Sequence, residues 1–222
     1  MSVSAERTSM KANHFPAPAV MRLSLYLREL DKLWHNDRRT VSSRELGDAL
    51  RISAPQIRKD LAYFGTFGRP GIGYDIAELM TKLRKILGTD RTWNVLLVGA
   101  GNLGMALSAY RGFSRKGFRL VAVFDSDERK VGRTVAGQTE LVIQPLSDLA
   151  ATVRDRDIRL AIVAVPAESA QGVADQLVAA GVRGLLNFAP ISLNVDPKVA
   201  VAAVDLAVEL EQLSFQLGAE EG

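Results

Sequence analysis

The apolar residues of this chain follow two different patterns, and the change between them divides the sequence. Up to about residue 88, apolar positions recur every three or four residues, as in Leu23, Tyr26, Leu27 and Leu30, which predicts amphipathic helices. From residue 94 onward, short runs of consecutive apolar residues alternate with helical stretches. Such runs are typical of buried parallel strands joined by helices. The sequence therefore predicts a helical N-terminal domain followed by an α/β domain with a doubly wound parallel sheet.

Two capping signals mark short helices in the N-terminal domain. Residues 42–45 (SSRE) and 53–56 (SAPQ) each place a serine three residues before Glu or Gln, which is the arrangement of a capping box. They predict helices over residues 43–50 and from residue 54 to about residue 64. So short a connection between two helices is typical of a helix-turn-helix.

The second of these helices has one face suited to nucleic acid. Its apolar residues, spaced i, i+4 and i+7 from Ile57, point to the core, whereas Gln56, Arg58 and Lys59 offer hydrogen-bond donors. Donors of this kind can reach base edges and phosphates. An ordinary amphipathic helix with a solvated face is the alternative.

A turn-rich segment follows. Residues 65–74 (GTFGRPGIGY) predict a tight hairpin, or wing, with a basic tip at Arg69. Residues 75–87 then predict another amphipathic helix, and residues 88–90 a domain boundary. Three helices followed by a wing is the order of a winged-helix domain.

The α/β domain opens with a glycine pattern of the dinucleotide-binding type. Its residues are Gly99-Ala100-Gly101-Asn102-Leu103-Gly104, placed between an apolar strand and a helical run. Gly99 permits the tight turn, Gly101 leaves room for a pyrophosphate, and Gly104 lets the helix lie close to the sheet. Asp125 ends the next predicted strand, where a carboxylate is expected to bind the adenosine ribose. A degenerate loop that holds no nucleotide is the alternative.

Charge and composition narrow the class of protein. Residues 1–90 hold fifteen Lys and Arg against ten Asp and Glu, whereas the rest holds thirteen against fifteen, so the surplus of positive charge favours a polyanion partner for the N-terminal domain. The absence of cysteine excludes disulfides, thiolate metal sites and a cysteine nucleophile. We expect no metal, no secretory signal and no membrane span, and a cytoplasmic location.

The last predicted helix, over residues 205–217, is apolar on most of its sides. Leu206, Leu210, Leu213 and Leu217 form one face, and Val208 and Phe215 widen it. Such a helix needs burial on most sides, and a partner subunit can supply it. Packing on its own domain is the alternative.

Together these features resemble the Rex family of redox-sensing transcriptional repressors, over about residues 17–217. The matching segments are residues 56–65 (QIRKDLAYFG), 71–74 (GIGY), 98–104 (VGAGNLG), 124–127 (FDSD), 186–190 (LNFAP) and 204–210 (VDLAVEL). The resemblance implies a homodimer with exchanged C-terminal helices that binds double-stranded operator DNA and is released by NADH, with NAD+ competing. It implies a flexible tail (1–16), a winged-helix DNA-binding domain (17–88), a Rossmann NAD(H)-binding domain (89–202) and a swapped dimerisation helix (203–222).

The resemblance also assigns roles to residues. Cofactor binding is implied for Gly99, Ala100, Gly101, Asn102, Leu103, Gly104, Asp125, Val165, Pro166, Asn187 and Leu206. DNA binding is implied for Ser53, Gln56, Arg58, Lys59, Arg69 and Gly71, within a helix-turn-helix region from about Tyr26 to Gly65. A switch that couples cofactor to DNA is implied for Arg28, Tyr110 and Asp205. This chain differs from some members of the family at two positions. Those members have Phe where this chain has Leu206, and a basic residue where it has Pro70.

Two other functions compete with a sensor. In an NAD-dependent dehydrogenase with an accessory N-terminal domain, hydride transfer needs an acid or base near the cofactor, but His14 and His35 both lie far from the glycine pattern in the sequence. We therefore expect no enzyme and assign no catalytic residue. In a sensor of another nucleotide, a coenzyme A derivative or NADP would replace NAD. Asp125 argues against NADP because it would repel a 2′-phosphate.

Overall fold

The computed structural model describes residues 17–68, 71–135 and 138–220, and the chain forms two compact units, Met1–Arg91 and Thr92–Gly222. The predicted tail, residues 1–16, and the predicted wing tip, Arg69, lie outside the described residues.

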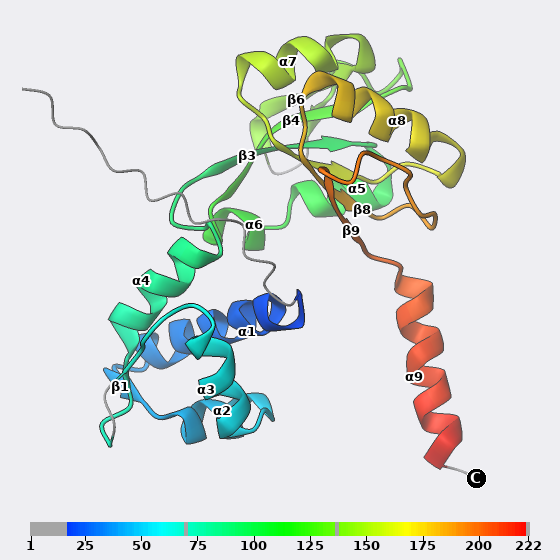
Figure 1. Cartoon of the computed structure of the whole chain (residues 1–222). Coiled ribbons are helices and arrows are strands. Elements are labelled where there is room, and N and C mark those ends of the chain that lie inside the picture. The colour runs from blue at the N-terminus through cyan, green and yellow to red at the C-terminus, as the bar shows by residue number, and fades with distance from the viewer. Residues whose placement is uncertain (1–16, 69–70, 136–137, 221–222) are drawn as a thin grey trace, which may run out of the picture. The chain divides into compact units, whose positions relative to one another are not determined.

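The first unit contains four helices and a two-stranded sheet among its described residues (Figure 1). In chain order these are α1 (Ala17–His35), β1 (Thr40–Val41), α2 (Ser43–Leu50), α3 (Ala54–Ala62), β2 (Tyr74–Asp75) and α4 (Ile76–Ile86). The helices enclose an apolar core that includes Leu23, Leu30, Leu46, Ile57 and Leu83. This order of elements confirms the predicted helix-turn-helix.

The two predicted capping boxes differ in the structure. At α2 both bonds are present, because Ser42 Oγ accepts from the Glu45 N–H and the Glu45 carboxylate accepts from the Ser42 N–H. At α3 Ser53 Oγ accepts from the Gln56 N–H, but the Gln56 side chain donates to Asp60 instead of turning back. The prediction of a full box at α3 was wrong, because a buried carboxylate one turn along the helix takes the Gln56 amide.

The predicted hairpin over residues 65–74 includes residues 69 and 70, which lie outside the described residues, so it stays a prediction. β2 pairs antiparallel with β1, a strand that lies before α2 and was not predicted. Gly73 has φ +91°, and a Cβ there would lie 2.6 Å from the Val41 carbonyl oxygen. A glycine is therefore required where the loop enters the small sheet.

The second unit is built on a seven-stranded sheet in the order β5-β6-β4-β3-β7-β8-β9 (Figure 1). From β6 to β9 the strands are parallel and follow the order of dinucleotide-binding folds, with β5 antiparallel at the edge. The strands are β3 (Trp93–Val98), β4 (Phe118–Asp125), β5 (Thr134–Val135), β6 (Gln138–Pro145), β7 (Leu160–Val163), β8 (Gly184–Asn187) and β9 (Ala200–Ala203). The doubly wound sheet is confirmed, although β5 was not predicted.

Helices lie on both faces of this sheet. Leu96 and Val98 of β3 belong to the core formed with α7 (Leu149–Asp155) and α8 (Ala167–Ala180). Val95 and Leu97 point to the other face, toward α5 (Asn102–Ser108) and α6 (Gly112–Arg115). Side chains alternate along a strand, so the continuous apolar run of β3 serves two cores.

The last helix, α9 (Leu206–Glu220), follows β9 and begins one residue later than predicted. The Asp205 carboxylate caps it by accepting from the N–H groups of Ala207 and Val208. Its apolar side chains are exposed, from 43% at Val208 to 79% at Phe215. None of the described helices is both long and apolar enough to cross a membrane.

The capping box of α2 yields a prediction on pH. Hydrogen bonding from the Ser42 N–H, followed by the Arg38 guanidinium, lowers the pKa of Glu45 to about 2. Since this pKa is depressed in the folded state, the contribution of Glu45 is full above pH 4.5 and is lost as the pH falls toward 2. Replacing Glu45 by Gln should lower the free energy of unfolding by up to about 1 kcal/mol at pH 7, and by less at pH 3.

Urea unfolding followed by Trp34 fluorescence in a Trp93→Phe background measures this, because Trp34 then reports the first unit alone. Glu78→Gln is the matched control, since that carboxylate pairs with Lys82. An equal loss for Glu45→Gln at both pH values would contradict the assignment.

Candidate nucleotide-binding and DNA-binding sites

The three glycines of the loop after β3 meet different surroundings. A Cβ at Gly99, which has φ +102°, would lie 2.3 Å from the Ala164 carbonyl oxygen, and one at Gly104 would lie 1.8 Å from that of Gly99. Gly101 has nothing within 4 Å of the corresponding position, and it precedes the first turn of α5. Two glycines therefore allow close packing, and the third leaves open space beside free N–H groups of a helix N-terminus.

Asp125 ends β4 next to this loop and is only 7% exposed. Its carboxylate accepts from the Ala100 N–H at 2.7 Å, the Asp127 N–H at 2.8 Å and Lys130 Nζ at 3.0 Å. Burial alone would raise the pKa of Asp125, but these donors lower it, so the group is charged at neutral pH. The carboxylate holds the glycine loop against β4, a role that was not predicted.

The other predicted cofactor residues lie at the carboxyl ends of neighbouring strands. Val165 and Pro166 follow β7, and a Cγ atom of Val165 lies 3.0 Å from the Cβ position of Gly99. Asn187 ends β8, but it is buried and its side chain bonds Ala189 and Ile191 of its own loop. Leu206, by contrast, is 61% exposed at the start of α9.

The three predicted switch residues belong to both units. Arg28 is exposed on α1 of the first unit. In the second unit Tyr110 is 60% exposed and packs edge-on against Phe113, with ring centroids 5.1 Å apart, whereas Asp205 caps α9. Tyr110 also covers Gly112, since a Cβ there would lie 2.2 Å from the tyrosine ring.

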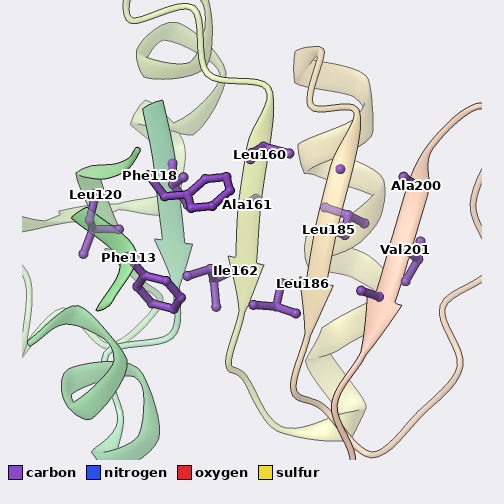
Figure 2. Close-up of a pocket in the computed structure, with 13 residues that line it drawn as sticks. Phe113, Phe118, Leu120, Leu160, Ala161, Ile162, Leu185, Leu186, Ala200 and Val201 are labelled. Carbon is purple, nitrogen blue, oxygen red and sulfur yellow. The ribbon is translucent and has the colours of Figure 1, made fainter. Parts of the chain in front are cut away.

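An apolar hollow of about 350 Å³ lies on the sheet face that bears α6 (Figure 2). Its lining comes from α6 and from β3, β4, β7, β8 and β9. Figure 2 shows Phe113, Leu120, Ile162, Leu186 and Val201 among these side chains. The lining is almost wholly hydrocarbon, which suits an apolar occupant rather than a sugar or a phosphate.

The predicted DNA-binding residues of the first unit lie on and around α3. Arg58 and Lys59 are exposed, and Arg58 donates to Ser43 Oγ at 2.9 Å. Ser53 caps the helix. Gly71 is exposed in the loop before β2, with nothing within 4 Å of its Cβ position.

A buried carboxylate on α3 was missed by the sequence analysis. Asp60 accepts from Arg22 Nε at 2.5 Å and Arg22 Nη2 at 2.7 Å, from the Tyr26 hydroxyl at 2.6 Å and from Gln56 Nε2 at 2.7 Å. Burial would raise the pKa of Asp60, but hydrogen bonds from these three residues lower it. The signal was present, because Asp60 is three residues from Ile57 and so lies on the inward side of the helix.

Comparison with known proteins gives matches in both units. A family model described as "Putative DNA-binding protein N-terminus" matches residues 14–62, and one described as "CoA binding domain" matches residues 90–191. A solved structure described as "RSP, a Rex-family repressor" has a TM-score of 0.83 and 36% identity, and covers 93% of this chain and 95% of its own. A complex of RSP with beta-NAD+ and operator DNA has a TM-score of 0.87 and 38% identity, over 94% and 95% of the two chains.

Curated relatives match over nearly their whole length. The redox-sensing transcriptional repressor Rex of Carboxydothermus hydrogenoformans is 48% identical over 94% of this chain and 99% of its own. That of Desulforamulus reducens is 46% identical over 96% of this chain and 100% of its own. With identity at this level across both units, the chain belongs to the Rex family of redox-sensing transcriptional repressors.

Proposed function

We propose that this protein binds operator DNA as a homodimer and is released when NADH occupies its second unit, with NAD+ competing for the same site. The observation that carries the proposal is the open space at Gly101, beside a helix N-terminus in a sheet of dinucleotide-binding order. The same chain presents an exposed basic helix in a helix-turn-helix. In support, RSP has been solved with beta-NAD+ and operator DNA, and with beta-NADH at a TM-score of 0.83.

In this proposal the second unit holds the dinucleotide along the carboxyl edge of its sheet. The residues that would contact it are Gly99, Ala100, Gly101, Asn102, Leu103, Gly104, Val165, Pro166 and Leu206. Asp125 and Asn187 stay predicted cofactor-binding residues, Asp125 for the adenosine ribose, and both would also shape the site through the bonds that they make to its loops. In this proposal the cofactor takes part in no reaction. The site only has to bind its reduced form, NADH, differently from its oxidised form, NAD+.

In the first unit, α3 would enter the major groove. Arg58 and Lys59 would bind bases or phosphates, Ser53 would fix the start of the helix, and Gly71 would let the wing loop approach the backbone. Arg69 stays a predicted phosphate contact from the wing. Arg28, Tyr110 and Asp205 would couple the two units, since one carboxylate can pair with either an arginine or a tyrosine hydroxyl.

We infer that the dimer forms by exchange of α9. The exposed leucines of this helix and the apolar hollow beside β9 are complementary in chemistry, and β9 leads into α9 after Val204 and Asp205. A helix from a second copy would cover the hollow, and its own hollow would receive α9 in return.

We propose a sensor rather than an enzyme, acting on DNA in the cytoplasm. His35 lies on α1 of the first unit, and His14 lies outside the described residues. Steady consumption of NADH with a small carbonyl substrate would favour the dehydrogenase alternative instead.

Operator binding in the two cofactor states tests the proposal directly. A duplex that the protein selects from a random pool serves as the probe, and fluorescence anisotropy measures affinity. We expect NADH to weaken binding roughly 100-fold, which corresponds to about 2.7 kcal/mol of coupling, and NAD+ to reverse this by competition. Equal affinity with NADH, with NAD+ and without either would exclude the sensor.

The glycine loop supplies a matched pair of variants. Gly101→Ala should leave thermal stability unchanged, because its Cβ meets open space, but should weaken NADH binding by about tenfold or more. Gly104→Ala should destabilise the second unit, because its Cβ would overlap the Gly99 carbonyl. Gly172→Ala in α8, where the Cβ also meets open space, is the control for NADH binding; it should keep the parent affinity and raise thermal stability slightly, because alanine favours a helix. Parent-like NADH affinity in Gly101→Ala would move the cofactor elsewhere.

A charge introduced on the apolar face of α9 tests whether this helix forms the dimer interface. Leu210 is 66% exposed on α9, and we expect Leu210→Glu to convert the dimer to monomers in analytical ultracentrifugation. Glu211→Gln on the same helix should sediment like the parent. A Leu210→Glu protein that stays dimeric would show that α9 lies outside the interface.

A further inference from the structure

The face of α3 that is turned inward carries a charge. Asp60 is wholly buried, and a buried carboxylate is tolerated only when charged or polar partners satisfy it. Both of its oxygens are occupied by donors from two helices. Oδ2 accepts from Arg22 and Tyr26 of α1, and Oδ1 accepts from Arg22 and from Gln56 of α3 itself.

This geometry fixes α3 in both position and rotation. Arg22 donates two hydrogen bonds to the Asp60 carboxylate from two of its nitrogens, and the Tyr26 hydroxyl donates a third from one turn further along α1. Forked contacts of this kind have a narrow range of geometry. Rotation of α3 about its axis would break them, so contacts on the inward side of the helix fix the direction in which Lys59 faces.

The same network restrains Gln56. A glutamine reads adenine with both its amide oxygen and its amide nitrogen. In this structure the nitrogen is 2.7 Å from Asp60, and the side chain is only partly exposed. Turning Gln56 toward a base would remove a donor from a buried charge, which is costly.

We propose that Asp60 is a positioning residue for DNA recognition and that Gln56 acts through Asp60 rather than by contacting a base. The inference rests on the proposed DNA-binding function. It assigns base and phosphate contacts to the outward cations of α3 and gives Arg22, Tyr26 and Gln56 the task of holding the helix in register.

Two mild variants and one contrasting variant test the inference. Gln56→Met keeps the length of the side chain and removes its bond, and Tyr26→Phe keeps the ring and removes the hydroxyl. Each should weaken binding to the selected duplex by about 3–10-fold. Lys59→Ala is the contrast, because loss of a phosphate contact should reduce the salt slope by about one unit. Circular dichroism and thermal unfolding check that each variant is folded at the assay temperature.

The readouts separate positioning from contact. We expect Gln56→Met and Tyr26→Phe to keep the parent salt slope and NADH affinity, and to weaken every single-base variant of the duplex by the same factor. Relaxed preference at one base position in Gln56→Met would show that Gln56 reads that base, and would overturn its assignment. Parent-like affinity in both variants would overturn the role of Asp60. A parent protein that selects no duplex would overturn the proposed function as well, so the two failures can be told apart.

Discussion

The exposed apolar surface of α9 is the feature on which the proposed assembly of this protein depends. Full burial of one leucine or phenylalanine side chain is worth about 1.5–3 kcal/mol, and α9 exposes several of them. The hollow beside β9 is a second exposed apolar surface, on the sheet. Since β9 lines the hollow and also leads into α9, the proposed two-fold exchange would bury both apolar surfaces in one interface.

The proposed two-fold assembly would determine which DNA sites the first unit can recognise. Two copies of α3 related by a two-fold axis fit a palindromic site, with half-sites separated by whole turns of the duplex. Each copy would then have to hold α3 at a fixed angle, because a misplaced α3 in one copy would weaken binding of the whole dimer to the two half-sites. The buried bonds of Asp60 supply that rigidity within each unit, independently of how the units are placed. The proposed dimer therefore depends on local rigidity at α3 as much as on α9.

Local patterns in the sequence predicted much of this fold, and partners distant in sequence account for the rest. The cap of α2, the strand before Gly99 and the outward cations of α3 each follow from a few adjacent residues. The pairing of β1 with β2 could not be predicted, because two-residue strands carry no periodic signal. The ion pair of Arg22 with Asp60 joins residues 38 apart, and spacing on one helix does not reveal its partner on another.

The fold also shows where the energy of a cofactor switch can reside. The glycine loop is held in shape by hydrogen bonds within the protein, above all the one from the Ala100 N–H to Asp125. A ligand shifts an equilibrium only through elements that it contacts differently in the two states. A preorganised loop of this kind contributes affinity for the dinucleotide but little discrimination between its oxidised and reduced forms. In the proposed mechanism the discrimination between NADH and NAD+ would therefore come from contacts with the nicotinamide end of the cofactor, for which we propose the exposed side chains of Tyr110 and Leu206.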